Sequence, residues 1–326
     1  MTSHKKIVVC GAGGFIGGHL VADLLSRGAD DIRAVDIKPL DQWFQCFHKV
    51  DNLQLDLMNK EACEEAANGA SELYNLAADM GGMGFIESHK ARCMLSVLIN
   101  THLLMAAHKM GLHRYFYSSS ACVYASYRQN RPGAKALQED DVYPAQPEDG
   151  YGWEKLFSER MCRHFTEDFG IPTRIARYHN VYGPHGTYNG GREKAPAAIC
   201  RKVIEAKLSG KHEIEIWGDG HQTRSFMYID DCIYGTLRIM QNNNATIPIN
   251  LGSDEEVSIN QLVDTVEDIS GVALKRTYRL NGPKGVKCRN CDNTYIKELL
   301  GWKPSTSLRT GLEKTYQWIY DEMINM

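Results

Sequence analysis

The 326-residue chain lacks a long hydrophobic run and a strong excess of charge. No stretch approaches the ~18 apolar residues that a transmembrane helix needs, and the N-terminal segment reaches its glycines after only a few apolar residues, unlike a signal peptide. The formal net charge of -3 provides no basic surface for nucleic acid or for acidic lipids. We therefore expect a cytoplasmic globular protein with neither nucleic-acid nor membrane partners.

Internal repeats and low-complexity tracts are also missing, and the cysteines form no disulfide framework. The 10 cysteines are scattered singly, which without a signal sequence indicates reduced thiols. Cys288 and Cys291 make a Cys-x-x-Cys pair, but no second pair or histidine cluster accompanies them, and a zinc site needs about four ligands. The sequence therefore predicts no metal site.

The chain does contain a regular alternation of strand-like and helix-like segments. β-branched and aromatic residues predict strands in KKIVVC and at 31–37, 52–57, 71–78, 113–121, 173–183 and 247–253. Helical periodicity fills most of the intervals between them. Strands that alternate with helices predict an α/β fold with a doubly wound parallel sheet.

The texture of the sequence changes after about residue 184, where Gly, Pro and charged residues become dense. This change predicts a smaller lobe that closes over the carboxyl edge of the sheet. We place the sheet domain at 1–183, with later strands contributed from 225–255. Residues 184–326 are expected to form mainly the lobe.

The motif GAGGFIG places Gly11, Gly14 and Gly17 at the first strand-to-helix turn. Glycines there allow backbone amides to approach a pyrophosphate at the helix N-terminus, although a glycine-rich turn can also exist without a ligand. Asp36 follows about 20 residues later, where a carboxylate accepts a hydrogen bond from a ribose 2′-OH and repels a 2′-phosphate. Asp56 is placed to contact the adenine. The sequence therefore predicts a bound dinucleotide, NAD rather than NADP.

Tyr151 and Lys155 lie at i and i+4, on one face of an expected helix. Lys155 can lower the pKa of the tyrosine and hold the nicotinamide ribose. Tyr151, near Ser120, can then take a proton from a sugar hydroxyl as hydride leaves the carbon. A surface Tyr–Lys pair is the alternative, but the dinucleotide turn and the serine-rich strand end favour the catalytic interpretation.

These motifs occur together with SSSA-x-VY, RYHNVYGP and LGWKPSTSLRTGLEKTYQWI. The combination resembles the extended short-chain dehydrogenase/reductase family of nucleotide-sugar enzymes, over nearly the whole chain. The resemblance implies a Rossmann-type domain with a smaller C-terminal substrate-binding lobe, tightly held NAD and a homodimer. It also implies that a sugar hydroxyl is oxidised first, often at C4. The shared motifs leave open whether 4-epimerisation, 4,6-dehydration, decarboxylation or reduction follows.

Cys122, two residues after Ser120, is unusual for that family, where a 4-epimerase typically has Thr. A thiolate near Lys155 and the oxidised nicotinamide could remove a hydrogen next to a 4-ketone, since positive charge lowers a thiol pKa. Taken alone, the residue is better explained as a small buried hydrophobe. The motif GGREKAPAA supplies Lys194, which can face Cys122 across the sugar, although a solvated charge cluster is the plainer interpretation.

The pairing of SSSACVY with GREKAP, together with ADMGGMGFIES, EIWGDGHQTRSF and GVKCRNCDN, resembles the GDP-mannose 3,5-epimerase branch of the family. The resemblance implies that Ser120, Cys122, Tyr151, Lys155 and Lys194 are catalytic. Tyr151 would assist oxidation at C4, and Cys122 and Lys194 would exchange protons on opposite faces at C3 and C5. Hydride would then return to C4, giving GDP-L-galactose, or GDP-L-gulose when C5 alone is inverted. Which residue of the pair is the base stays open.

The resemblance also implies two sets of binding residues. The NAD contacts would be Gly11, Gly14, Phe15, Ile16, Gly17, Asp36, Asp56, Leu57, Leu76, Ala77, Ala78, Ser118, Tyr151 and Lys155. The contacts with GDP-mannose or a related GDP-sugar would be Gly82, Met83, Ser120, Cys122, Asn180, Glu193, Lys194, Ala195, Lys202, Gln222, Arg224 and Arg289. Among these, Gln222, Arg224 and Arg289 are expected at the guanosine diphosphate, because a guanidinium fork suits phosphate oxygens.

The chain departs from the family pattern at Ala125–Tyr127, at Gly150 and Trp153 in DGYGWEK, and at His185. It also ends at Met326, where plant members continue, so any substrate contact made by their tail is expected to be absent or replaced. Another GDP-sugar is therefore an open alternative. A 4-epimerase or a 4,6-dehydratase is a second alternative, and a non-catalytic NAD-binding redox sensor is a third, which the complete Ser120, Tyr151 and Lys155 set disfavours.

Overall fold

The structure is a computed structural model that describes residues 5–131, 133–283 and 285–325. A seven-stranded sheet runs through it in the order β11-β6-β5-β4-β1-β2-β3, and all paired neighbours are parallel. Its strands are β1 (Lys6–Cys10), β2 (Ile32–Asp36), β3 (Asp51–Gln54), β4 (Ala70–Asn75), β5 (Arg114–Ser120), β6 (Thr173–Tyr178) and β11 (Ile249–Leu251). The predicted α/β fold with a parallel sheet is confirmed.

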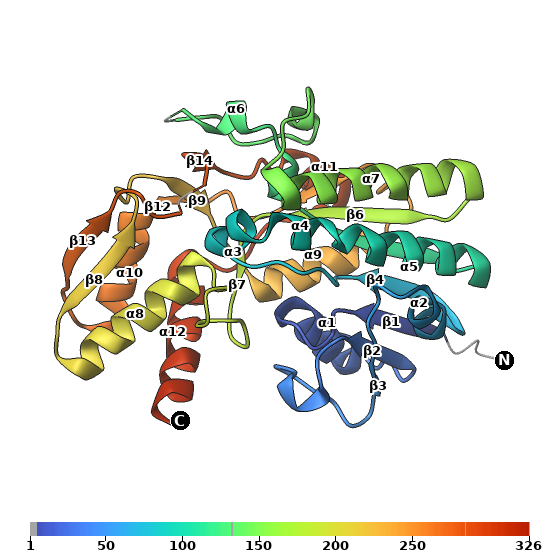
Figure 1. The fold of residues 1–326 in the computed structure, drawn as a ribbon, viewed down its shortest axis with the longest axis horizontal. Helices are drawn as coiled ribbons and strands as arrows, with labels where there is room; N and C mark the ends of the chain where they lie inside the picture. The colour runs from blue at the N-terminus through green and yellow to red at the C-terminus, as the bar shows by residue number, and fades with distance from the viewer. Residues whose placement is uncertain (1–4, 132, 284, 326) are drawn as a thin grey trace.

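Helices cover both faces of this sheet (Figure 1). One face carries α2 (Lys60–Ala67), α5 (Ser96–Met110) and α7 (Asp149–Phe169), which pack on one another and on the strands. The opposite face carries α1 (Phe15–Ser26) and α9 (Ile229–Gln241), and α11 (Thr294–Leu300) lies beside β11. A strand that helices cover on both faces needs side chains that are apolar, or polar side chains that pair within the protein. This applies to β6, which is buried along its whole length.

The strand order reverses between β1 and β4. The chain winds one way from β1 through β2 to β3 and the other way from β4 through β5 to β6. In open α/β sheets, ligands bind outside the carboxyl ends of the strands at such a switch point. The ends of β1, β4 and β5 are therefore where site residues should gather.

The later part of the chain forms smaller elements beside that edge. β8 (Glu213–Trp217) pairs with β13 (Lys275–Arg279), and β9 (Thr223–Ser225) lies between β12 (Glu256–Ser258) and β14 (Cys288–Arg289). The helices α8 (Ala195–Ser209), α10 (Ile259–Ser270) and α12 (Leu308–Ile324) pack together next to these strands. Figure 1 shows this group beside the large sheet, with the C-terminus at the end of α12.

Local sequence signals explain where these helices begin and end. Ser258 and Gln261 form a capping box at the start of α10, because each side chain bonds to the other residue's backbone N–H. Gly271, with φ of +71°, ends that helix in the left-handed conformation that glycine adopts most readily. Pro196 lies in the first turn of α8, where its missing N–H is not needed.

The strand predicted at 173–183 is wrong as a single element. It divides into β6 and a short β7 (Val181–Tyr182), and β7 pairs with β10 (Met227–Tyr228) outside the large sheet. The break occurs at Asn180, whose φ of +45° is incompatible with an extended strand. The side chain of Asn180 holds the bend by donating to the carbonyl of Ser225 at 3.0 Å.

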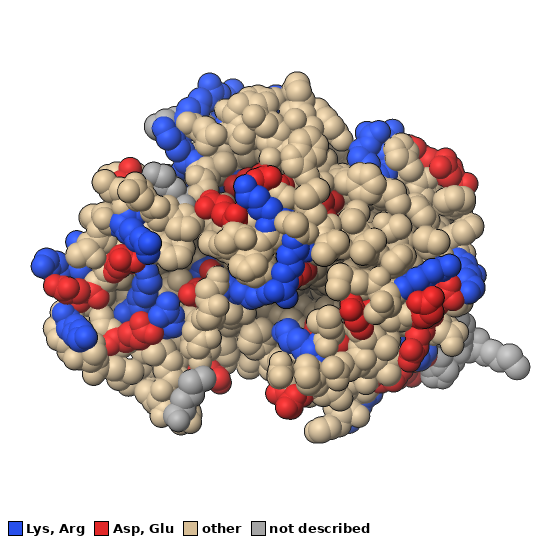
Figure 2. All heavy atoms as spheres, in the orientation of Figure 1, with Lys and Arg blue, Asp and Glu red and all other residues tan. Residues whose placement is uncertain are grey.

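The remaining described elements are short and surround the carboxyl edge of the sheet or the loops near it. They are η1 (Leu40–Gln42), α3 (Met83–Ser88), α4 (Lys90–Met94), η2 (Ala121–Val123), α6 (Ser126–Gln129) and η3 (Glu139–Val142). Within the described parts of the chain, no helix is long and apolar enough to cross a bilayer. Figure 2 shows acidic and basic side chains interspersed over the face in view.

Candidate active site

The glycine-rich turn after β1 is a close-packed backbone cradle. Gly11 has φ of +84°, and the N–H of Gly14 donates to its carbonyl at 3.1 Å. A Cβ at Gly17 would lie 2.1 Å from that same carbonyl oxygen, so only glycine fits. Phe15 and Ile16 open α1 directly after the turn. The amides of the turn and of the first helical turn are thus available to a pyrophosphate, as predicted for a dinucleotide.

The other predicted NAD contacts lie at the ends of neighbouring strands. Asp36 ends β2, is 8% exposed, and accepts a hydrogen bond from the N–H of Lys38 at 3.0 Å. The remaining positions follow β3 or β4 or lie on β5 and share this edge of the sheet: Asp56, Leu57, Leu76, Ala77, Ala78 and Ser118. The residues present therefore fit a dinucleotide laid across the switch point.

Tyr151, Lys155 and Ser120 meet where β5 faces the first turns of α7. Lys155 is 2% exposed; its Nζ donates to the carbonyl of Ser118 at 3.0 Å and lies 5.7 Å from the ring centroid of Tyr151. Burial raises the pKa of Tyr151 well above its usual value, the electrostatic interaction with Cys122 adds to the rise, and a hydrogen bond with Ser120 opposes it. A positive charge next to Tyr151 favours the ionised phenol, and Lys155 lies at its ring.

Cys122 and Lys194 line the same cavity as Tyr151. The cavity has a volume of about 260 Å³, and all predicted substrate contacts lie on its wall. These are Gly82, Met83, Ser120, Cys122, Asn180, Glu193, Lys194, Ala195, Lys202, Gln222, Arg224 and Arg289. The structure therefore brings together residues from β5, the 180–195 segment, α8, β9 and β14, which the chain separates widely.

Lys194 reaches the cavity because the loop before α8 is anchored on the sheet side. The guanidinium of Arg192 lies 3.8 Å from the ring centroid of Phe85 and pairs with Asp79 at 2.6 Å. A Cβ at Gly82 would lie 2.3 Å from the carbonyl oxygen of Glu193, so this loop packs on bare backbone. Burial lowers the pKa of Lys194, which favours the neutral amine that can accept a proton.

Other residues of the cavity wall are polar. The side-chain amide of Gln222 donates to the carbonyl of Trp217 at 2.9 Å, and its oxygen has no hydrogen-bond partner among the described residues. Lys202 donates to the carbonyl of Glu215 at 2.7 Å. Arg224 is 9% exposed, and burial lowers its pKa to about 10. These donors and this acceptor suit a phosphorylated polar ligand.

Sequence reasoning predicted Arg289 but missed the residues that hold it, Glu148 and Gln129. Arg289 donates to the sulfur of Cys122 at 3.5 Å and pairs with Glu148, while Gln129 accepts from Arg289 Nε at 2.7 Å. The only available signal for Glu148 was its place three residues before Tyr151. Trp217, another residue of the cavity wall, was also missed. It ends β8 and lies in EIWGDGHQTRSF, which supported the family resemblance without pointing to this side chain.

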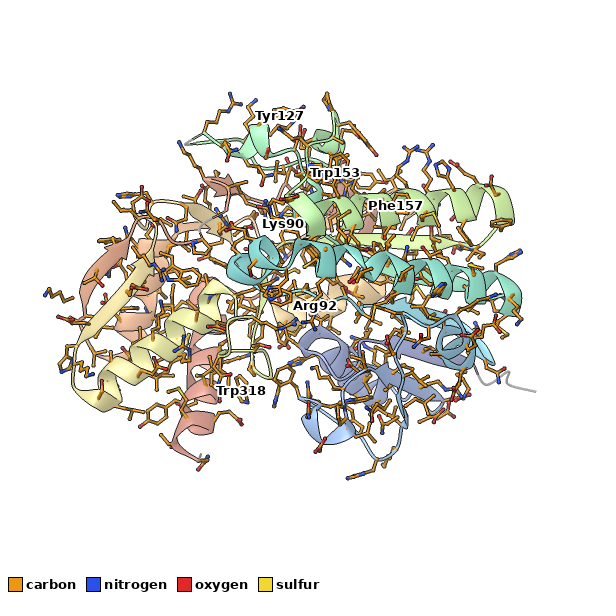
Figure 3. All side chains as sticks on the ribbon, in the orientation of Figure 1. Lys90, Arg92, Tyr127, Trp153, Phe157 and Trp318 are labelled. Carbon is orange, nitrogen blue, oxygen red and sulfur yellow. The ribbon has the colours of Figure 1, made fainter. Side chains whose placement is uncertain are left out.

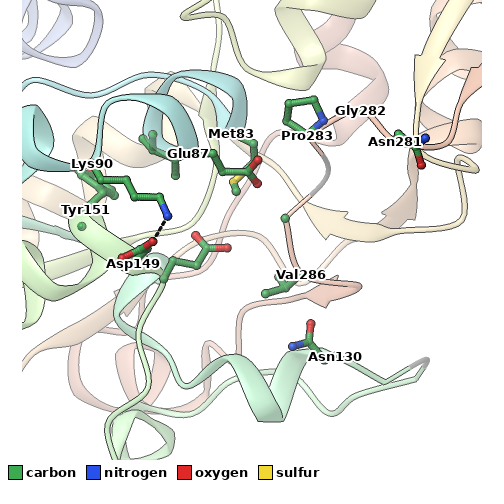
Figure 4. Close-up of a pocket in the computed structure, with 14 residues that line it drawn as sticks. Met83, Glu87, Lys90, Asn130, Asp149, Tyr151, Asn281, Gly282, Pro283 and Val286 are labelled. Carbon is green, nitrogen blue, oxygen red and sulfur yellow. Dashed lines mark ion pairs between the residues drawn. The ribbon is translucent and has the colours of Figure 1, made fainter.

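A second cavity of about 660 Å³ adjoins the first (Figure 4). Met83, Ile86, Tyr151 and Pro283 line both cavities. Glu87, Glu148, Asp149 and Lys90 add charged groups to the second one, and Lys90 pairs with Asp149. This open space therefore lies directly next to the residues that face Cys122.

A model of the NAD dependent epimerase/dehydratase family matches residues 7–252. The chain belongs to this family. Two relatives are similar over almost the whole chain. GDP-mannose 3,5-epimerase 1 of Oryza sativa subsp. japonica is 44% identical, covering 98% of this chain and 82% of the relative. GDP-mannose 3,5-epimerase of Arabidopsis thaliana is 43% identical, covering 99% and 84%.

Solved structures of similar enzymes agree with the family. UDP-glucuronic acid 4-epimerase from Bacillus cereus, in complex with UDP-glucuronic acid and NAD, has a TM-score of 0.83 at 28% identity, covering 97% of this chain and 99% of that one. UDP-glucose 4-epimerase from Thermotoga maritima has a TM-score of 0.87 at 24% identity, covering 98% and 99%. In this NAD dependent epimerase/dehydratase family member, the predicted Rossmann-type fold and the NAD cofactor are confirmed. The individual site residues stay predictions.

Proposed function

We propose that the protein is a GDP-mannose 3,5-epimerase. The observation that carries this proposal is that Cys122 and Lys194 share one cavity with the oxidation residues Ser120 and Tyr151. Inversion at a carbon requires a proton to leave one face and return on the other, so two proton-transferring groups are needed beside the oxidation site. The two plant relatives named GDP-mannose 3,5-epimerase support this choice of substrate.

The chain's own residues account for each proton in the reaction. When bound, NAD accepts the hydride of C4 and later returns it. Tyr151, in contact with Ser120, takes the proton of the C4 hydroxyl, and Lys155 holds the ribose side of the site. The resulting 4-ketone acidifies the hydrogens at C3 and C5. Cys122 and Lys194 then remove and supply protons at these carbons, and Tyr151 returns its proton as the ketone is reduced.

The polar end of the cavity is proposed to bind the guanosine diphosphate. Arg224 and Lys202 provide cationic groups, and Gln222 provides an unpartnered acceptor for a base or ribose donor. Asn180, whose backbone bend is fixed by Ser225, borders the sugar end with Gly82 and Met83. The lobe at 184–326 would thus mainly bind substrate, and the sheet at 1–183 would hold NAD.

Incubation with GDP-mannose in deuterated water tests this function. We expect deuterium at both C3 and C5, because the acidified hydrogens exchange with solvent through Cys122 and Lys194. The measurement is proton NMR of the recovered sugar nucleotide, which also identifies GDP-L-galactose and GDP-L-gulose. Deuterium at neither carbon contradicts the proposal, and a lasting 4-keto-6-deoxy product identifies a 4,6-dehydratase instead.

The protein is further proposed to be a cytoplasmic homodimer. Its cysteines are all unpaired thiols, which suits a reducing compartment. The adjacent helices α5 and α7 expose apolar side chains at helical spacing: Leu98 and Met105 on α5, and Trp153 and Phe157 on α7. Figure 3 shows Trp153 and Phe157 on α7. A second copy of the chain can cover this face with the same face by two-fold symmetry.

Phe157→Glu is expected to convert the dimer to a monomer. The side chain of Phe157 is 52% exposed, so a carboxylate is tolerated in the single chain but would be desolvated in the dimer. Mass measurement by light scattering after gel filtration reads out the result. Leu208→Glu is the matched control, because Leu208 is 53% exposed on α8, away from this face. A Phe157→Glu protein that stays dimeric contradicts this interface.

A further inference from the structure

The side chain of Cys122 is held by an arrangement that the proposed proton transfers do not require. Arg289 Nη1 donates to its sulfur at 3.5 Å and also to Glu148 Oε2 at 3.1 Å. The second guanidinium nitrogen, Nη2, lies 2.8 Å from Glu148 Oε1, an ion-pair contact without hydrogen-bond geometry, so Nη1 makes the hydrogen bond of this pair. The Arg289 and Glu148 side chains are only 5% and 13% exposed. The two hydrogen bonds of Nη1, to the sulfur and to Glu148, hold this end of the guanidinium against Cys122.

Glu148 and Arg289 are each fixed by further contacts. The backbone N–H of Glu148 donates to the carbonyl of Cys122 at 2.9 Å. Arg289 Nε donates at 2.7 Å to Gln129, which is fully buried and itself donates to the carbonyl of Tyr124 at 3.0 Å. Arg289 therefore cannot turn away from Cys122 without breaking its hydrogen bonds at Nε and Nη1 and its ion pair with Glu148.

We propose that Glu148 is a positioning residue that holds Arg289 on the sulfur of Cys122 and offsets its charge, so that Cys122 rests as a thiol. The proposal rests on the proposed epimerase function, in which Cys122 exchanges a proton with the sugar. A lone arginine at this distance would favour the thiolate, because an opposite charge stabilises the ionised form. A carboxylate bound to the same guanidinium removes most of that effect.

The charges around Cys122 support this balance. The charged and titratable groups that face it are Glu148 and Tyr151 near the start of α7, Arg289 on β14, Arg224 on β9, and Lys194 before α8, with the hydroxyl of Ser120 at the end of β5. Burial raises the pKa of Cys122 to about 12, and Glu148 adds to the rise while Arg289 opposes it. Burial also opposes ionisation of Glu148, but Arg289 outweighs it and lowers that pKa, so the carboxylate stays charged.

The test is the alkylation rate of Cys122 in the holoenzyme, measured with iodoacetamide as a function of pH and quantified on the Cys122 peptide by mass spectrometry. Only the thiolate reacts, so the rate follows its population. In Glu148→Gln, which keeps the size of the side chain but removes its charge, we expect the pKa of Cys122 to fall by about 1–3 units. The alkylation rate at pH 8 should then rise at least about tenfold, because lowering the thiol pKa by one unit raises the thiolate population about tenfold.

Two control variants separate this role from a general loss of acidic charge. Glu148→Asp keeps the charge, so the thiolate population of Cys122 should change little. Its alkylation rate should stay within about twofold of the rate in the parent protein. Asp149→Asn makes the same chemical change in the next residue, which lines the same cavity but pairs with Lys90, and should leave the rate unchanged (Figure 4). An equal rise in Asp149→Asn overturns the proposal. So does an unchanged rate in Glu148→Gln, including a Cys122 that stays unreactive in both proteins.

The parent protein decides the question if Glu148→Gln does not fold or loses NAD. If the alkylation rate of Cys122 in the parent protein reaches half its maximum at a pH above the usual thiol pKa of about 8.5, the resting thiol is supported. A half-maximal rate at or below that pH contradicts the proposal. None of these measurements uses a sugar, so they stand even if GDP-mannose is not the substrate. With an active substrate, the pH profile of deuterium exchange in Glu148→Gln should shift to lower pH by the same amount, which a purely structural role would not produce.

Discussion

Cys122→Ala is expected to abolish deuterium incorporation at C3 and C5 of GDP-mannose while NAD stays bound. In the proposed reaction the sulfur exchanges the proton on one face of the sugar ring, and alanine has no atom that can transfer a proton. Loss of one acid–base group costs about 10²–10⁴-fold in rate. Exchange is measured by NMR, and bound NAD by its release on denaturation. Hydride transfer at C4 should survive, visible as a reversible absorbance of reduced nicotinamide.

Cys93→Ala is the matched control for this variant. Cys93 is fully buried and belongs to the same apolar cluster as Cys122, Tyr151, Phe85 and Ile86. Removing its sulfur has a similar packing cost but takes away no group from the wall of the cavity. If Cys122→Ala exchanges deuterium at C3 and C5 as fast as Cys93→Ala does, Cys122 is only a packing residue. That is the alternative of a small buried hydrophobe considered from the sequence.

Tyr151→Phe is expected to stop the reaction one step earlier. Without the phenol, no group takes the proton of the C4 hydroxyl, so neither the ketone nor any exchange at C3 and C5 should form. The expected loss is about 10²–10⁴-fold for hydride transfer and exchange together. Stopped-flow absorbance of the nicotinamide and NMR of the sugar measure the two steps. The two variants therefore differ in one observable, since Cys122→Ala keeps hydride transfer and Tyr151→Phe does not.

Tyr117→Phe controls for the loss of a buried phenol. Its hydroxyl donates to Glu154 at 3.1 Å, and its ring lies 4.7 Å from Lys155 Nζ, but it does not line the cavity. This variant should keep both steps. If Tyr151→Phe retains hydride transfer at the rate of Tyr117→Phe, the proposed role of Tyr151 is wrong.

Local patterns in the sequence were sufficient wherever residues close in the chain act together. The GAGGFIG turn could be predicted because the approach of Gly17 to Gly11 is set within one turn of backbone. Tyr151 and Lys155 share a helix face through the i, i+4 spacing alone. The strand-helix alternation gave the parallel sheet for the same reason, since each strand and helix is recognised from its own residues.

The strand predicted at 173–183 shows where local patterns fail. Apolar residues continue through Val181 and Tyr182, but Asn180 bends the chain so that β7 pairs with β10. Nothing within the segment specifies this partner, because β10 lies about 45 residues later in the chain. It can pair with β7 only after folding has brought the two segments together. The side chain of Asn180, bonded to the carbonyl of Ser225, fixes the outcome.

The sequence by itself determined the fold class, the dinucleotide turn and the Tyr–Lys pair, since these depend on periodicity and short spacing. The assembly around Cys122 was decided by the tertiary structure. Arg289 is 167 residues from Cys122, and β14, Gln129 and Glu148 direct it to the sulfur, while its contact with the diphosphate stays a prediction. The charge of a buried thiol depends on groups within a few ångströms in space, and no spacing along the chain specifies which groups those are.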